Sequence, residues 1–150
     1  MATVEETLAR LSKSTFRARF RLNERDRAYA KRVGREKIAS HAADFIRDRL
    51  APAEIPNDGH QTPMRGHPVF VAQHACACCC RGCLSKWYHI PPGRPLSDDE
   101  QARIVRLLLA WIDRQIELPL FGHKWVRDPS AERISVDLEE GQITEFDDPD

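Results

Sequence analysis

Five cysteines and one histidine lie within ten residues, in the segment HACACCCRGC at positions 74–83, and the chain has no other cysteine. Thiolate sulfur and imidazole nitrogen are preferred protein ligands of zinc, and cysteine sulfur also holds iron–sulfur clusters. Cys80 and Cys83 form a C-x-x-C motif, and Cys79 precedes Cys83 by four positions. Either pair would place two sulfurs on one turn of backbone, at a distance that one zinc ion can bridge. The segment therefore predicts a metal site.

The chain has no second C-x-x-C motif, so the remaining ligands of such a site would be histidines. Four of the six histidines lie between residues 60 and 89, close to the cysteines in sequence. His67 and His74 are the first choices, and His89 or Cys79 is a substitute. Zinc is the expected metal and an iron–sulfur cluster is the alternative. The predicted ligand set is His67, His74, Cys79, Cys80 and Cys83.

Two other interpretations of the cysteines stay open. A thiolate beside a base can act as a nucleophile or a redox group, and Cys79 or Cys83 near His74 would supply both partners. A thioredoxin-type pair would need a βαβ context, which the proline-rich surroundings do not offer. The cysteines can also pack as free thiols, and we favour this role for Cys76 and Cys78, which alternation places away from the C-x-x-C motif.

Charged and polar residues surround the cluster. Arg65 and Arg81 would suit an anionic ligand beside a metal, and we predict them as candidate anion-binding residues. The neighbouring polar residues are better explained as partners of backbone groups in an irregular loop than as a substrate-binding wall; they are Asn57, Asp58, Gln61, Thr62 and Gln73.

One known zinc template can be compared directly. His41 precedes the C-x-x-C motif, as a histidine does in zinc deaminases, but the spacing is wrong and the first 34 residues read as helical. His41 also shares a predicted helix face with Ile38 and Phe45, which favours a core or site-supporting role for it.

The composition is that of a soluble globular protein. The chain has 150 residues, of which 41% are hydrophobic and 31% charged, enough for one ordinary domain with its own core. No apolar run approaches the length of a membrane span, and the opening MATVEETLARL lacks the features of a signal peptide. We therefore expect a cytoplasmic protein without membrane association. An odd number of cysteines in a reducing compartment makes a disulfide framework the weaker interpretation.

The net charge of zero hides an asymmetry along the chain. Residues 1–50 carry a net charge of +6, residues 51–96 of +2 and residues 97–150 of −8. The basic segment at 16–27 could contact phosphate, with Phe16, Phe20 and Tyr29 stacking on bases. A solvated helix face is the simpler explanation, so we expect at most weak, salt-sensitive nucleic-acid binding. A protein partner is the other expected kind of interaction.

Helix signals alternate with a proline-rich centre. The segment after Ser97 opens with a capping box that Glu100 completes, and an apolar stripe follows it. By contrast, residues 52–73 contain four prolines and predict an irregular loop, with at most a short extended piece at 69–71. The predicted helices cover residues 24–33, 35–50, 78–88 and 97–117.

The last part of the chain has a different pattern. Residues 133–146 alternate polar and apolar side chains around a turn signal, which predicts a small β-hairpin. We therefore predict a mainly α (α+β) protein, with a helical Cys/His domain at 1–117 and an acidic extension at 118–150.

Three segments of the chain carry a family resemblance. The stretches APAEIPNDG, QTPMRGHPVFVAQHA and CCRGCLSKW, which begin at residues 51, 61 and 79, resemble an uncharacterised bacterial family catalogued as domain of unknown function number 4186. The resemblance covers residues 10–117 and implies a self-contained domain without an assigned activity. The family pattern has a histidine directly after the tryptophan. Tyr88 stands there in this chain, which makes His89 the weaker ligand candidate.

The sequence favours a small metal-binding accessory or interaction protein, with a structural zinc site and a role on or near nucleic acid. The competing interpretation is an enzyme that uses the same cluster for metal-assisted hydrolysis or thiol chemistry. The two differ at the metal: a structural site is closed by four protein ligands, whereas a catalytic site keeps one position open.

Overall fold

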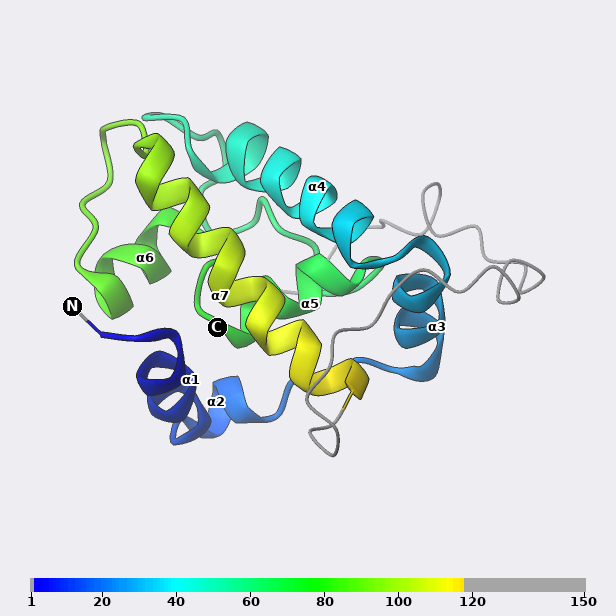
Figure 1. Ribbon diagram of the computed structural model, residues 1–150. Coiled ribbons are helices and arrows are strands. Elements are labelled where there is room, and N and C mark those ends of the chain that lie inside the picture. The colour runs from blue at the N-terminus through cyan, green and yellow to red at the C-terminus, as the bar shows by residue number, and fades with distance from the viewer. Residues whose placement is uncertain (1, 118–150) are drawn as a thin grey trace.

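The computed structural model describes residues 2–117 (Figure 1). These residues form α-helices and one π-helical turn without any strand, so the described part of the chain is mainly α, as predicted. None of its helices combines the length and the apolar content needed to cross a bilayer. The elements are α1 (Val4–Ser12), α2 (Thr15–Ala18), α3 (Glu24–Val33), α4 (Arg35–Phe45), the π-helical turn η1 (Ile46–Leu50), α5 (Pro68–Ala75), α6 (Arg81–Tyr88) and α7 (Asp98–Glu117).

Helix α7 is the centre of the fold. It runs diagonally across the molecule in Figure 1 and contacts α1, α3, α4, α5 and η1. Its buried stripe includes Ile104, Leu108 and Ile112, which recur every four positions and so share one helix face. The shorter helices surround this stripe and bury it.

The start signal of α7 and the stop signal of α3 act as the sequence predicts, whereas the helix predicted over 78–88 begins only at Arg81, as α6. Ser97 Oγ accepts a hydrogen bond of 3.0 Å from the Glu100 amide, and the Glu100 carboxylate accepts one of 2.9 Å from the Ser97 amide. This capping box starts α7. Helix α3 ends at Gly34, whose φ of 91° lies in the region that favours glycine. The predicted helix over 35–50 is confirmed as α4 followed directly by η1.

The prediction of an extended piece at 69–71 is wrong, because these residues lie in α5. Val69 and Val71 favour strands by propensity, but Pro68 occupies the first helical position, where its fixed φ suits a helix. His67 caps the helix, since its Nδ1 accepts a hydrogen bond of 3.0 Å from the Val69 amide. Every residue of α5 is buried, so no amphipathic pattern marks it in the sequence.

Residues 118–150 lie outside the described part of the chain, and so does the hairpin predicted at 133–146. The division of the chain at Glu117 stays a prediction.

Candidate metal centre

Three of the five cysteines come together where α6 begins. The sulfur atoms of Cys79, Cys80 and Cys83 all lie within 4.8 Å of one another, and 3.6 Å separates Cys79 Sγ from Cys83 Sγ. In a tetrahedral zinc site with Zn–S bonds of about 2.3 Å, neighbouring sulfurs are about 3.8 Å apart. The cluster therefore has a spacing that can hold one metal ion with little rearrangement.

The first turn of α6 places the C-x-x-C motif. Cys80 is the N-cap, in an extended conformation, and its sulfur accepts a hydrogen bond of 3.3 Å from the Cys83 amide. The amide of Arg81, the first residue of α6, donates to Asp58 Oδ1 at 3.0 Å. A capping cysteine and a cysteine three residues later point to the same side of the turn. This is the local reason why the motif gathers its two sulfurs.

Polar side chains hold the loop that carries Cys79. Thr62 Oγ1 donates to the Cys79 carbonyl at 2.8 Å, and Gln73 Nε2 donates to the Cys78 carbonyl at 3.1 Å. Ala77 adopts a positive φ of 60°, so the backbone reverses sharply here. For Thr62, Gln73 and Asp58 the predicted role as partners of loop backbone is confirmed.

Arg17 brings a positive charge to the sulfurs from α2. Its Nη2 lies 3.3 Å from Cys83 Sγ and its Nη1 lies 3.9 Å from Cys79 Sγ. The same Nη1 donates to the His74 carbonyl at 2.6 Å, which fixes the guanidinium over the cluster. Arg17 is buried. Sequence reasoning missed it, because nothing in the basic segment distinguishes Arg17 from its exposed neighbours and 66 positions separate it from Cys83.

The hydrogen bonds of the cluster distribute its protons unequally. The pKa of Cys83 is lowered, because its sulfur accepts hydrogen bonds from Cys79 and Cys80 and faces Arg17. The pKa of Cys79 is raised, because its thiol donates to its neighbours and is buried. Of the three clustered thiols, that of Cys83 therefore loses its proton most readily when no metal is bound, and Arg17 lies beside its sulfur.

His67 does not join the cysteines. Its Nδ1 accepts from the Val69 amide, so the neutral ring carries its proton on Nε2, which lies 3.0 Å from His41 Nδ1. Both ring nitrogens are thus committed away from the cluster. His41 supports this arrangement, in keeping with the core or supporting role predicted for it.

Burial keeps His67 neutral and makes folding sensitive to acid. Burial, followed by the charges of His41 and Arg49, lowers the pKa of His67 to about 3. Between pH 6.5 and 3 the unfolded chain binds a proton at this position and the folded chain does not, so stability falls as the pH falls. We expect His67 to contribute a slope of at most about 1.4 kcal/mol per pH unit in that window. Urea denaturation at a series of pH values measures it.

The variant His67→Asn supplies the control, because asparagine can still cap α5 but does not titrate. Asp26 acts in the opposite direction: burial raises its pKa from 3.8 to about 6, which adds stability as the pH falls through that range. The prediction therefore concerns the difference in slope between the wild type and His67→Asn. Parallel pH profiles for the two proteins would contradict it.

His74 lies next to the cluster and is held by backbone. Its Nε2 is 3.0 Å from the Thr62 carbonyl and 3.2 Å from the Pro63 carbonyl, so this nitrogen donates. Burial lowers the pKa of His74, which favours the neutral ring. Of the two histidines first predicted as ligands, only His74 lines the same cleft as the sulfurs.

Cys76 and Cys78 lie in the core, apart from the cluster. Both are fully buried, and the Cys78 thiol donates to the Cys76 carbonyl at 3.4 Å. Burial raises the pKa of both thiols. Their predicted packing role agrees with these contacts.

Arg81 has a structural role instead of the predicted anion-binding one. Its side chain is 1% exposed, and its guanidinium donates to backbone carbonyls at the end of η1 and in the two loops after η1 and α6. Nη1 contacts the carbonyls of Leu50 at 3.4 Å and Pro52 at 2.9 Å, and Nη2 contacts those of Pro91 at 3.0 Å and Arg94 at 2.8 Å. Carbonyl oxygens occupy Nη1 and Nη2, the two terminal nitrogens that an exposed anion would need, while Nε is buried without a partner. Arg65 is exposed on the preceding loop, and its anion-binding role stays a prediction.

The cluster forms part of the wall of a cleft of about 470 Å³. Cys79, Cys80 and Cys83 line it together with Arg17 and His74, and the lining also includes Phe16, Lys86 and Trp87. A metal held by the three sulfurs would therefore lie beside a space that a small molecule can enter. Arg17 offsets the charge of the sulfurs, and Lys86 adds a second cation to the lining.

One family model matches the chain, that of the domain of unknown function DUF4186, and the match covers residues 5–113. The chain belongs to the DUF4186 family. The matched range contains Arg17, the three clustered cysteines and the loop that positions them, so the whole candidate centre lies inside the DUF4186 domain. No solved structure matches the chain.

The basic segment of this DUF4186 chain is largely occupied by its own contacts. Tyr29 is 1% exposed, so it has no face available to a base. Phe16 and Phe20 pack edge to face at 5.2 Å, and Arg19 lies over Phe16 at 4.5 Å. Weak nucleic-acid binding by this segment stays a prediction.

Proposed function

We propose that this DUF4186 domain binds a zinc ion through the thiolates of Cys79, Cys80 and Cys83, with the fourth coordination position directed into the adjoining cleft. The observation that carries the proposal is the gathering of three sulfurs in the wall of a cleft. Zinc sites with three protein ligands and one accessible position bind water, substrates or partner side chains. The function we infer is thus metal-dependent binding or hydrolysis at the cleft.

The donor set and its surroundings favour zinc over an iron–sulfur cluster. Iron–sulfur clusters take four cysteines as a rule, and the described part of the chain brings three together. Three thiolates and Zn²⁺ leave one negative charge, which the guanidinium of Arg17 offsets at 3.3 Å from Cys83. Thiolates must also stay reduced to bind the ion, which suits the cytoplasmic location that we propose.

Cobalt substitution tests both halves of the proposal. Co²⁺ replaces Zn²⁺ in tetrahedral sites, and its visible bands report the number of thiolates and the presence of an outside ligand. We expect one Co²⁺ per chain with thiolate-to-cobalt charge-transfer bands, and visible bands that shift when imidazole is added. Bands that do not respond to imidazole would indicate a closed, structural site. Absence of thiolate-bound cobalt would reject the metal site altogether.

Thiol chemistry is the second candidate function, and the pairing of Cys83 with Arg17 favours it. A thiolate held beside a guanidinium at the wall of a cleft has the setting of a reactive cysteine. Under this alternative, the metal-free protein would be alkylated at Cys83 by iodoacetamide at neutral pH, and adding zinc would not slow the reaction. Under the zinc proposal, stoichiometric Zn²⁺ protects Cys83.

A further inference from the structure

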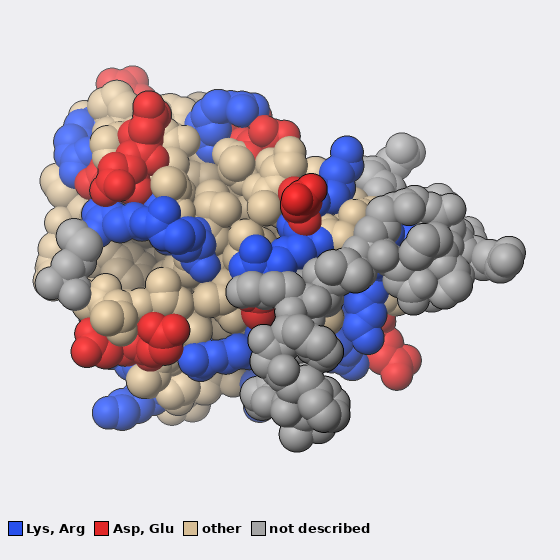
Figure 2. Space-filling view, in the orientation of Figure 1, with Lys and Arg blue, Asp and Glu red and all other residues tan. Residues whose placement is uncertain are grey.

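A second cleft, of about 480 Å³, lies between α1, the end of α6 and α7. Its volume falls in the range of small-molecule binding sites. Figure 2 shows a hollow of uncharged surface on this side of the molecule, bordered by a run of Lys and Arg atoms. Trp87 lines both this cleft and the cleft beside the three clustered cysteines, so the two clefts are neighbours. The rest of their linings differ.

The floor of the second cleft is apolar. Val4 from α1, Ile90 after α6, and Ile104 and Leu107 from α7 line it. Val4 and Ile90 pack on the buried core as partly exposed residues, which leaves apolar surface open to solvent. Covering such surface is favourable by about 25 cal/mol per Å². The floor therefore suits the apolar part of a ligand.

The rim of this cleft is positively charged. Arg10, Arg103 and Arg106 line it, against one acidic residue, Glu100. The guanidinium of Arg10 lies 4.8 Å from the centre of the Trp87 ring and donates to the Trp87 carbonyl, which holds it at the edge of the cleft. Cations at the mouth of an apolar cleft raise the local concentration of anions and orient them.

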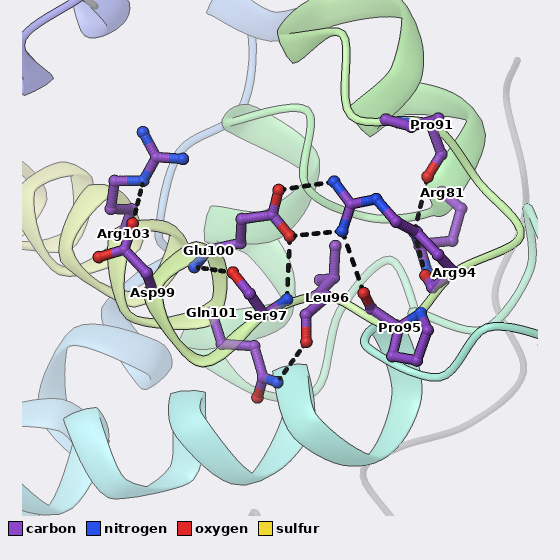
Figure 3. Close-up of polar contacts among 10 residues, drawn as sticks. All are labelled: Arg81, Pro91, Arg94, Pro95, Leu96, Ser97, Asp99, Glu100, Gln101 and Arg103. Carbon is purple, nitrogen blue, oxygen red and sulfur yellow. Dashed lines mark hydrogen bonds and ion pairs between the residues drawn. The ribbon is translucent and has the colours of Figure 1, made fainter.

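Two acidic residues at the start of α7, Asp99 and Glu100, have arginine partners (Figure 3). The Glu100 carboxylate turns to Arg94, which donates to its two oxygens at 2.9 Å and 2.8 Å. This contact lowers the pKa of Glu100 to about 2, so the pair stays charged and self-compensated. Asp99 pairs with Arg103 at 3.4 Å. With Glu100 paired to Arg94 and Arg103 paired to Asp99, Arg10 and Arg106 carry the excess positive charge of the lining.

We propose that this cleft binds a small amphipathic carboxylate, with its hydrocarbon part on the floor and its carboxylate at the arginine rim. Both parts of the lining are needed. The floor favours any ligand with a hydrocarbon chain, whatever the charge of its head group, and the rim selects ligands whose head group is an anion. Guanidinium groups pair with carboxylates through two parallel hydrogen bonds, which gives orientation as well as affinity. The proposal does not depend on the zinc site.

Calorimetric titration of the full chain with octanoate tests the proposal. We expect saturable binding with one site per chain and at least about tenfold weaker binding of octanol, which has the same hydrocarbon chain without the charge. The same result is expected before and after metal removal by chelator, so failure of the zinc proposal would leave this measurement unaffected.

Two exposed arginines of α7 provide a matched pair of variants. Arg106 lines the cleft, whereas Arg114 lies further along the same helix and does not. We expect Arg106→Gln to weaken octanoate binding about tenfold and Arg114→Gln to leave it unchanged. Absence of octanoate binding, equal binding of octanol, or equal behaviour of the two variants would each overturn the proposal.

Discussion

Replacement of Cys83 by serine is expected to abolish stoichiometric zinc binding. Cys83 is the residue that links the cluster, since it lies 3.6 Å from Cys79, contacts Cys80 through its amide and pairs with Arg17. A serine hydroxyl keeps the volume but is a poor zinc ligand at neutral pH. Because an ion that binds only the folded chain stabilises it, the variant should lose about 4 kcal/mol of unfolding free energy when free zinc is about a thousand times the wild-type Kd. Metal analysis and denaturation with and without zinc measure the two effects.

Cys76→Ser is the matched control for this experiment. Cys76 is the same residue type in the same ten-residue segment, but it is fully buried in the core away from the three sulfurs. We expect this variant to keep its zinc and its zinc-dependent gain in stability, with a modest loss from burying a hydroxyl. Similar losses in both variants would indicate cysteines that only pack. Wild-type protein that purifies without metal and melts identically in chelator would end the zinc proposal.

The sequence predicted the features that depend on neighbouring residues. Helix α7 follows from a capping box and an apolar stripe, both of which act within a few positions of Ser97. The grouping of Cys79, Cys80 and Cys83 follows in the same way from their spacing around one turn. Features of this kind can be predicted from the sequence because the interacting groups are close together in the chain.

Contacts between distant positions could not be predicted from the sequence. The pairing of Arg17 with Cys83 joins α2 to α6, and the basic segment around Arg17 gives no sign of it. His67 looked like a ligand because it lies near the cysteines in sequence, but it caps α5 and pairs with His41, 26 positions earlier. Pro68, directly after a residue able to cap, was the available signal for that helix.

A second large effect, a loss of folding stability, is expected when Arg81 is replaced. Arg81 lies between Cys80 and Cys83 in the sequence. Replacing it with methionine keeps much of the apolar stem but removes the donors for four carbonyls, those of Leu50, Pro52, Pro91 and Arg94. These carbonyls lie at the end of η1 and in the loops after η1 and α6, which approach each other: the Leu96 amide donates to the Ala51 carbonyl at 2.9 Å beside them. Buried acceptors without partners cost about 1 to 3 kcal/mol each where water cannot replace the donor. We expect Arg81→Met to lower the unfolding free energy by at least about 3 kcal/mol, as measured by urea denaturation.

Two further variants distinguish this structural role of Arg81 from a role that depends only on its positive charge. Arg81→Lys restores the charge but not the planar fork that reaches both loops, so we expect it to recover only part of the lost stability. Arg94→Met removes an exposed guanidinium that pairs with Glu100, while its backbone carbonyl still accepts from Arg81, and it should cost far less. Because the amide of Arg81 opens α6 between Cys80 and Cys83, loosening of the two loops should also weaken zinc binding in Arg81→Met. If Arg81→Met instead matched the wild type in stability and lost only its response to added anions, Arg81 would be an anion-binding residue and the carbonyl contacts would be dispensable.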